Sequence, residues 1–311
     1  MASATLLLPL RSRFAGQALS PALARALAQA DRETADAGDE GERAQLRRHF
    51  QLIPDHWPIA ALTRQRDAGD AAQSSWLRVD PAHIAPDRGG ARMLSHGEAL
   101  ALTAEDVAQL LPALRPLFGD VGFTLDAPHP SRWYLRLPRE SRLPTFATPD
   151  EALGEDLFAH LPDGDLGRRW RALLTEAQVI LHNHPWNAVR ASLGKPAVNS
   201  LWFWGAGALP DFVRTRYRQV KGNDILLRSL ASAAGVPDQT GEAEEVDALV
   251  DLRHLRDLGM LARDAVQPLL EAVRKRELQS LVLDFEDGAI FRLRREQRWR
   301  FWRKPLSKLD A

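Results

Sequence analysis

The sequence predicts an α/β protein whose core is interrupted by a smaller α+β module. In the first and last thirds, short apolar runs alternate with segments of helical spacing, which is typical of an α/β core. In the middle third, strands and helices are mixed in the manner of an α+β module. We therefore assign residues 1–75 and 195–311 to the core and residues 76–194 to the inserted module, with approximate boundaries.

The first third supplies a strand and two helices to the core. The apolar run ATLLLPL predicts a buried strand, and Ser20 caps a helix whose first turn holds Pro21. Residues 35–42 are acidic and contain glycine, which predicts an exposed loop. A second helix is expected near residues 43–50.

The middle third predicts three strands and two helices. The strands are expected at residues 76–79, 91–94 and 132–137. A helix should follow Thr103, where Thr-Ala-Glu-Asp resembles a capping box, and Pro112 and Pro116 should kink or shorten it. A second helix, LGRRWRALLTEAQVILHNH, carries an apolar stripe and ends at Pro185.

The last third returns to the core. AVNSLWFW predicts a buried strand, GAG a tight turn, and LPDFVRTRYR the start of another helix. A capped helix should end at Gly235, a strand is expected within residues 245–252, and a long helix over residues 257–277. The final apolar runs predict a hairpin that turns at Asp287 and Gly288.

The composition favours a cytoplasmic, soluble protein. Of the 311 residues, 45% are hydrophobic and 26% charged, and the formal net charge is zero, so no overall field would steer nucleic acid. The absence of cysteine excludes disulfides, thiolate catalysis and cysteine-based zinc sites. The apolar run near the N-terminus is too short for a secretory signal, and no run approaches the 18 residues of a membrane span.

Residues 182–207, HNHPWNAVRASLGKPAVNSLWFWGAG, are unusually rich in polar and aromatic side chains. His182 and His184 could bind a metal, but the cluster contains no carboxylate. Arg190, Arg214 and Arg216 flank a predicted strand–GxG–helix transition, where free backbone N–H groups would favour phosphate or carboxylate.

A buried polar network is the third interpretation of this cluster. Asn187 and Asn199 would tie loop backbone, since buried amides require hydrogen-bond partners, while Trp202 and Trp204 would fill space. The sequence leaves the metal site, the anion pocket and the structural network open.

The segment EAQVILHNHPWNAVRASLGKPAVNSLWFWGAGALP resembles archaeal-type cofactor-independent phosphoglycerate mutases, and more closely the RpfE-type regulatory proteins of bacteria. LRVDPAHIAPDRGGARML and ATPDEALGEDLFAHLPDG extend the resemblance over about residues 76–235. It implies an alkaline-phosphatase-like α/β core with a smaller inserted domain, and a strand at Arg78 that faces phosphate. The ligand-binding residues expected from the cluster and the resemblance are Arg78, His184, Asn187, Arg190, Asn199, Trp202, Trp204, Gly205, Gly207 and Arg214.

The sequence departs from these mutases at their metal and nucleophile motifs. The resemblance implies an Asp-Gly after the first strand, but LLLPLRSRF stands there. After His184 the only histidine is His254, and Asp251 with His254 could ligate at most one ion, whereas the family mechanism requires two metals. We therefore expect no metal and no cofactor, and no catalytic residue can be named.

The basic, aromatic segment FRLRREQRWRFWRKPLSK offers a second surface. Arginines interleaved with aromatic side chains can bind single-stranded nucleic acid, but the alternation of Trp299 and Phe301 with Arg298 and Arg300 favours a final strand with its aromatic side chains inside. Nucleic acid is therefore an unfavoured partner, and no membrane partner is expected.

The residues and the resemblance together favour a catalytically degenerate phosphoglycerate-mutase-like protein, a pseudoenzyme of RpfE type. It would bind a small phosphorylated or carboxylate ligand, or a protein partner, through an arginine-lined anion pocket and act in regulation. Two alternatives stay open: an active metal-dependent phosphomutase or phosphatase, and a binder of anionic partners or nucleic acid through the basic aromatic C-terminal segment.

Overall fold

The structure, a computed structural model, describes residues 2–36, 41–88, 90–237 and 247–309. The chain divides into a core unit, Met1–Asp55 with Phe212–Ala311, and an inserted unit, His56–Asp211. An insertion within an α/β core was expected at residues 76–194. The observed insertion is longer because α3 (Ile59–Ala68) and β8 (Ser200–Ala208) both belong to the inserted unit, where β8 pairs with a strand of its sheet.

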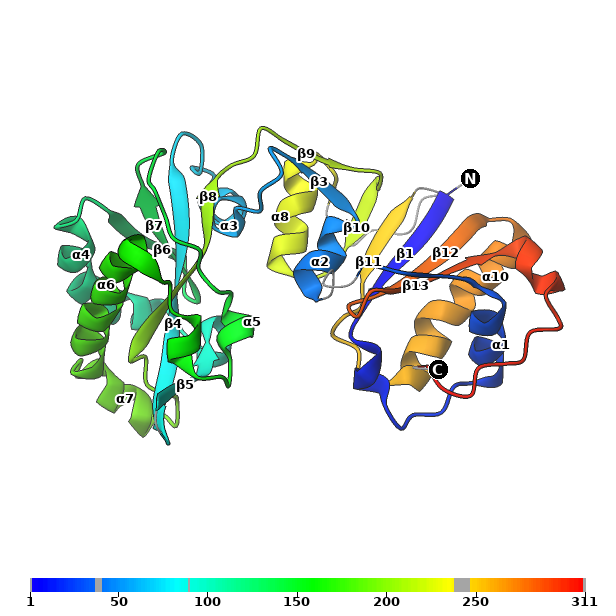
Figure 1. Ribbon diagram of the computed structural model, residues 1–311, viewed down its shortest axis with the longest axis horizontal. Helices are drawn as coiled ribbons and strands as arrows, with labels where there is room; N and C mark the ends of the chain where they lie inside the picture. The colour runs from blue at the N-terminus through cyan, green and yellow to red at the C-terminus, as the bar shows by residue number, and fades with distance from the viewer. Residues whose placement is uncertain (1, 37–40, 89, 238–246, 310–311) are drawn as a thin grey trace. The chain divides into compact units, whose positions relative to one another are not determined.

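The core unit contains a six-stranded sheet in the order β10-β11-β1-β12-β13-β2 (Figure 1). Its first four strands are parallel: β10 (Gln219–Lys221), β11 (Ala248–Asp251), β1 (Ala2–Leu8) and β12 (Leu278–Phe285). The last two complete it in antiparallel fashion: β13 (Ala289–Arg294) and β2 (Asp31–Thr34). The expected hairpin joins β12 to β13, with Gly288 at φ +78° in its turn.

One face of this sheet is covered by two helices, α1 (Pro21–Gln29) and α10 (Gln267–Lys275) (Figure 1). The Ser20 side chain accepts a hydrogen bond from the Leu23 N–H, which confirms the expected cap. Leu27 packs there on Leu6 and Leu283, whose side chains point to this face. The long helix expected at 257–277 is a continuous helical run in which α9 (Leu258–Met260) and a π-helical turn (Leu261–Val266) precede α10.

The remaining core elements include a two-stranded sheet of β3 (Phe50–Ile53) and β9 (Phe212–Thr215), with helices α2 (Glu42–Arg47) and α8 (Ile225–Ala233). The prediction of a helix over LPDFVRTRYR is wrong. Val213 is buried while Arg214 is exposed, which is the alternation of a strand, and Arg214 pairs with Gln51 of β3. Two 3₁₀ turns, Arg11–Phe14 and Arg295–Trp299, complete this unit.

The inserted unit contains a five-stranded antiparallel sheet around a long strand, β4 (Ser75–Asp87). β8 pairs with β4 along one side, whereas the other side is shared between two further strands. These strands and the outer one are β7 (Arg132–Leu137), β5 (Gly90–His96) and β6 (Thr124–His129). The expected GAG turn is wrong, because Gly205 to Gly207 continue β8.

Two helices, α4 (Ala104–Gly119) and α6 (Gly164–His182), pack on one face of this sheet. Leu77 and Val79 of β4 point into this core, whereas Trp76 points to the opposite face and packs on Ala60 of α3. Short elements complete the unit: η2 (Gly97–Leu100), α5 (Pro149–Ala152), η3 (Leu157–His160) and α7 (Trp186–Ser192). Among the described residues, no helix has both the length and the apolar character needed to cross a bilayer.

Candidate functional site

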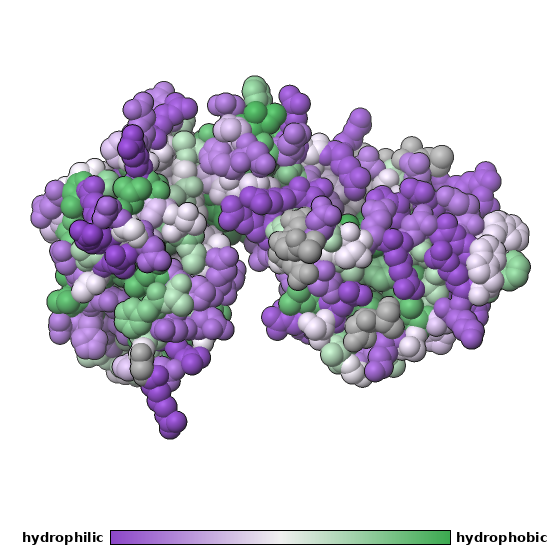
Figure 2. Space-filling model, viewed as in Figure 1, coloured by the Kyte–Doolittle hydropathy of each residue, from purple (hydrophilic) through white to green (hydrophobic). Residues whose placement is uncertain are grey.

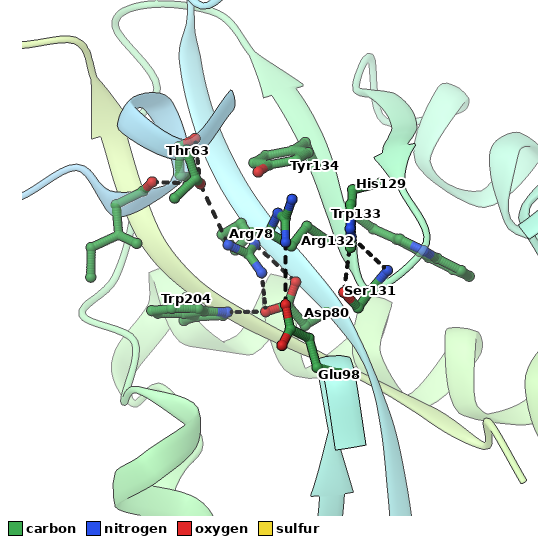
Figure 3. Close-up of polar contacts among 12 residues, drawn as sticks. Thr63, Arg78, Asp80, Glu98, His129, Ser131, Arg132, Trp133, Tyr134 and Trp204 are labelled. Atoms are coloured by element: carbon green, nitrogen blue, oxygen red, sulfur yellow. Dashed lines mark hydrogen bonds and ion pairs between the residues drawn. The ribbon is translucent and has the colours of Figure 1, made fainter. Parts of the chain in front are cut away.

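Arg78 lies in the middle of β4, on the face that α3 covers, and is 5% exposed. Its Nε and Nη2 atoms donate to the two carboxylate oxygens of Asp80 at 2.9 and 2.8 Å, and its guanidinium carbon lies 5.1 Å from the Trp204 ring centre and 5.3 Å from that of Tyr134. Trp204 donates from Nε1 to Asp80 at 2.8 Å (Figure 3). Arg78 is therefore held between two aromatic rings and already paired with a carboxylate.

The same face of the sheet carries a second buried ion pair. Arg132 makes two 2.8 Å hydrogen bonds to the carboxylate of Asp67, and the Tyr134 hydroxyl donates to Asp67 at 2.6 Å. Burial opposes ionisation of this carboxyl, but the bonds from Arg132 and Tyr134 hold the pKa of Asp67 below its ordinary value. These charges are neutralised within the protein and leave no excess of positive charge for a ligand.

Arg190 is fully buried, and its guanidinium is directed at protein oxygens. It donates to the carbonyl of Pro196 at 2.9 Å and to that of Leu100 at 2.7 Å, and its Nη1 lies 2.8 Å from Asp106 at the start of α4. Burial opposes ionisation of Asp106, but hydrogen bonds from Trp186 and Arg190 lower its pKa to about 2. Arg190 thus joins α7 to the start of α4, to Leu100 at the end of η2 and to the loop at Pro196.

The two asparagines of the cluster tie backbone segments together. Asn187 bridges Leu181 and Val198, accepting from the Val198 N–H at 2.8 Å. Asn199 makes a pair of hydrogen bonds with the backbone of Ile84, at 2.7 and 2.8 Å. These contacts are those of the structural network that the sequence left open.

Trp202 and His184 also make hydrogen bonds within the inserted unit. Trp202 is 3% exposed and donates to the carbonyl of Ala147 at 3.0 Å. His184 is half-buried, and its Nδ1 lies 3.2 Å from the backbone N of Trp186.

Gly205 and Gly207 are required by packing against α3. Gly207 has φ +146°, and a Cβ there would lie 2.7 Å from the Cβ of Pro58. Gly205 has φ +66°, and its Cβ would lie 3.1 Å from that of Ile59. Because β8 continues through both glycines and β9 follows, the strand–GxG–helix transition proposed as an anion site is absent from this segment.

Arg214 belongs to the core unit, where it lines an open pocket of about 380 Å³ that we call the β9 pocket. Arg214 is exposed, and within the described ranges its side chain has no ion-pair or hydrogen-bond partner. The residues that line the pocket include five arginines and one acid: Arg47, Arg48, Arg214, Arg216, Arg292 and Asp284. This pocket, rather than the predicted cluster, carries the excess of arginine.

A buried polar chain forms the floor of the β9 pocket. Asp284 lies 2.7 Å from Arg48 and 2.8 Å from His49, whose other ring nitrogen lies 2.8 Å from the Tyr217 hydroxyl. Burial opposes ionisation of Asp284, but the bonds from His49 and Arg48 lower its pKa. Arg216 donates to the same Tyr217 hydroxyl at 2.8 Å. Asp284 is thus already paired, and the exposed Arg214 at the rim has no partner among the described residues.

The weak metal candidates lie at the carboxyl end of β11, the edge of a parallel sheet where α/β proteins bind ligands. Asp251 accepts two 2.8 Å hydrogen bonds from Arg253, and His254 is exposed. Arg253 also contacts Glu42, and its Nη2 lies 3.4 Å from Asp224. We call these four residues, Glu42, Asp224, Asp251 and Arg253, the Arg253 cluster.

The Arg253 cluster does not fit a metal pair. Three carboxylates converge on one guanidinium, which supplies the positive charge that a cation would bring. These carboxylates raise the pKa of Arg253 against the opposing effect of burial, so it stays charged. Across the ranges that the structure describes, no group of three or more histidine, aspartate and glutamate side chains is arranged to hold a metal ion.

The sequence pointed to Arg214 and Arg216 as anion-binding candidates, but it did not point to Arg48 or Arg253. Glu42 and Arg253 are separated by 211 positions, and Arg48 and Asp284 by 236, so no local motif connects them. The Asp251-x-Arg253 spacing at the end of a predicted strand could have indicated that Arg253 pairs with the Asp251 carboxylate.

Comparison with known proteins relates the chain to phosphoglycerate mutases. It is 29% identical over 154 residues to a probable 2,3-bisphosphoglycerate-independent phosphoglycerate mutase of Geobacter sulfurreducens, covering 49% of this chain and 38% of that protein. It is 32% identical over 105 residues to the corresponding enzyme of Methanothrix thermoacetophila, covering 30% of this chain and 26% of that protein. The matched segments span well under half the length of these relatives. No protein-family model matches the chain.

A solved structure shares the fold. The PH0037 protein of Pyrococcus horikoshii superimposes with a TM-score of 0.51 at 14% identity, covering 93% of this chain and 86% of that one. The structure and this likeness confirm the expected α/β core with an inserted α+β module, and the curated relatives connect the chain to phosphoglycerate mutases at low identity.

Proposed function

We propose that this chain is a phosphoglycerate-mutase-like binding protein that has lost mutase chemistry and acts in regulation by binding a small phosphorylated or carboxylate ligand. The relatedness to phosphoglycerate mutases supports the ligand class. The regulatory role, and a bacterial, cytoplasmic setting, rest on the resemblance of residues 182–207 to RpfE-type proteins.

One observation supports the loss of mutase activity: the guanidinium of Arg253 forms ion pairs with the carboxylates at the carboxyl end of β11. A divalent cation would have to displace a charged side chain that makes two 2.8 Å bonds to Asp251. Breaking such a buried pair costs about 3–5 kcal/mol, so metal binding there is disfavoured. A phosphoryl transfer that depends on two metal ions, as in the related enzymes, cannot proceed when no metal is bound.

The β9 pocket supplies the binding part of the proposal. Arg214 and Arg216 are exposed at its rim, and each can present a planar pair of N–H donors to a phosphate or carboxylate. Its volume of about 380 Å³ suits a small molecule. Because Arg48 is already paired with Asp284, the incoming anion would be bound mainly by the two rim arginines.

The test combines an activity assay with a binding assay. We expect no conversion of 3-phosphoglycerate in the presence of Mn²⁺ or Mg²⁺, but saturable binding of 3-phosphoglycerate by calorimetry. The double variant R214Q/R216Q should bind it at least tenfold more weakly. The control R218Q removes an exposed arginine of the same segment that does not line the pocket, and it should bind as the native chain does.

Two outcomes would overturn the proposal. Metal-dependent mutase or phosphatase activity would establish the active-enzyme alternative instead. Equal loss of binding in R218Q and in R214Q/R216Q would show that net charge, rather than the β9 pocket, attracts the ligand.

A further inference from the structure

A second arginine-rich pocket lies on the opposite face of the core sheet, between α1, α10 and the 3₁₀ turn at residues 295–299. Its volume is about 320 Å³, and Ala26, Val273 and Leu293 form apolar parts of its wall. Its lining holds no acidic residue and five arginines: Arg25, Arg274, Arg294, Arg295 and Arg298. We call it the α1–α10 pocket.

The arginines of this pocket have few partners within the protein. In the part of the chain that the structure describes, the side chains of Arg25, Arg274 and Arg295 make no ion pair, and Arg294 lies 3.8 Å from its only carboxylate, Asp31. Arg298 packs on the Trp299 ring, with 4.7 Å between its guanidinium carbon and the ring centre. The pocket therefore concentrates positive charge that the protein itself does not neutralise.

Arg295 gives the most specific signal. Its Nε atom is shielded from solvent and has no hydrogen-bond acceptor among the described residues. Native proteins rarely leave a shielded N–H donor without an acceptor. The neighbouring charges of Arg276 and Arg298, together with burial, lower the pKa of Arg295. An oxyanion inside the pocket would satisfy the donor and relieve this repulsion.

We propose that the α1–α10 pocket binds a phosphate monoester, with its oxygens accepting hydrogen bonds from Arg295 and Arg274. Planar guanidinium groups match phosphate oxygens in pairs. The apolar wall would contact the carbon part of the ester. This site is separate from the β9 pocket, with which it shares no lining residue.

The surroundings of the pocket leave two sources for such a group, a soluble metabolite and a lipid headgroup. Trp299, Phe301 and Trp302 follow the pocket in sequence and are 64%, 82% and 68% exposed. Figure 2 shows pale and green side chains standing out at the right margin, where the C-terminal segment lies in Figure 1. Exposed aromatic side chains next to arginines are also found where proteins contact membrane interfaces. The sequence predicted a final strand with Trp299 and Phe301 inside the protein. This prediction is wrong, because residues 295–299 form a 3₁₀ turn and both side chains are exposed.

The experiment measures binding of glycerol 3-phosphate by calorimetry and of phosphatidylcholine vesicles containing phosphatidic acid by sedimentation. Both are performed in the R214Q/R216Q background, so that the β9 pocket does not contribute. The variant R274Q/R295Q should lose at least tenfold in affinity for the probe that binds. The control R168Q/R263Q removes the same net charge from two exposed arginines outside the pocket, and it should bind unchanged. The single variant R25Q, at an exposed helix position, tests the same pocket if the double variant does not fold.

Each result decides the proposal. Binding of glycerol 3-phosphate that R274Q/R295Q abolishes supports a soluble ligand. Vesicle binding that is abolished by R274Q/R295Q and also weakened by W302A supports a lipid headgroup. Absence of binding to both probes, or binding that R274Q/R295Q and R25Q retain, overturns the proposal. Since the β9 pocket is disabled throughout, either failure leaves the proposed function untouched.

Discussion

Arg253 and Asp251 form a two-pronged ion pair at the carboxyl end of β11, with both hydrogen bonds at 2.8 Å. Arg253 is 7% exposed, and Asp251 is 9% exposed. Glu42 and Asp224 complete the Arg253 cluster from two other segments of the chain. At the edge of the sheet where an α/β protein would bind a ligand, these carboxylates are therefore paired with the protein's own guanidinium.

Replacing Arg253 by methionine should destabilise the protein by about 3–5 kcal/mol, because three carboxylates are left without their positive partner. Urea unfolding followed by circular dichroism measures this change. The matched control R263M removes an exposed arginine paired only with Asp264 and should cost at most about 1 kcal/mol. Equal effects of the two variants would show that pairing with Arg253 does not stabilise these carboxylates.

The stability of R253M should also become dependent on divalent cations. Millimolar Mg²⁺ should restore part of the lost free energy of unfolding in R253M, since a cation can then approach the three carboxylates. The native protein should show no such gain, and a similar gain in both would contradict this role of Arg253.

Arg190→Ala should lower the free energy of unfolding by about 3–5 kcal/mol, because the buried Asp106 carboxylate loses its positive partner and two carbonyl oxygens lose their donor. Thermal and urea unfolding provide the measurement. Arg168→Ala, which removes a largely exposed side chain paired with the exposed Asp165, should change stability by at most about 1 kcal/mol. A nearly unchanged R190A would indicate that Arg190 is free to bind a ligand.

Asp106 predicts a dependence of stability on pH. Its pKa lies near 2 in the folded protein against an ordinary value of 3.8, because hydrogen bonds from Trp186 and Arg190 outweigh burial. A lowered folded pKa contributes stability that is complete above the unfolded value and is lost as pH falls from about 4 to 2. The native protein should therefore lose roughly 2 kcal/mol more than Asp106→Asn across this interval. Parallel pH profiles of the two proteins, measured by urea unfolding, would contradict the assignment.

Gly207→Ala should destabilise by about 1–3 kcal/mol, because the new Cβ would lie 2.7 Å from the Cβ of Pro58 at a φ of +146°. Gly119→Ala is the control: no atom lies within 4 Å of a Cβ at this position, and its φ is not positive. That variant, at the end of α4, should be neutral or stabilising by up to about 1 kcal/mol. If both variants melt with the native protein, close packing of β8 on α3 does not explain the glycine.

The sequence was a good guide to features determined by neighbouring residues. The caps at Ser20 and Thr103 and the turn at Gly288 each depend on side chains or backbone within three residues, and all are observed. Pro112 and Pro116 were expected to kink or shorten their helix, and the shortening is wrong, since α4 contains both. Both prolines are exposed, while the buried stripe of Leu110, Leu114 and Phe118 holds the helix on the sheet.

The candidate sites depended on contacts that a local pattern does not contain. β9 resembled the start of a helix, and its pairing with β3 joins residues more than 150 positions apart. The sequence indicated a dense polar cluster at residues 182–207. Within it, Asn187 hydrogen-bonds to the backbone of Val198, and Arg190 pairs with Asp106 at the start of α4. The two arginine-rich pockets are each formed by arginines from segments that are distant in the sequence. A single sequence does not show which of these arginines lie together in the fold.

The most direct test of the account is a calorimetric titration of the native protein with Mn²⁺, followed by an assay of 3-phosphoglycerate conversion on the same sample. We predict no saturable, stoichiometric Mn²⁺ binding and no conversion, because Arg253 is paired with the carboxylates of Glu42, Asp224 and Asp251. Binding of one or two Mn²⁺ ions per chain together with mutase turnover would contradict it.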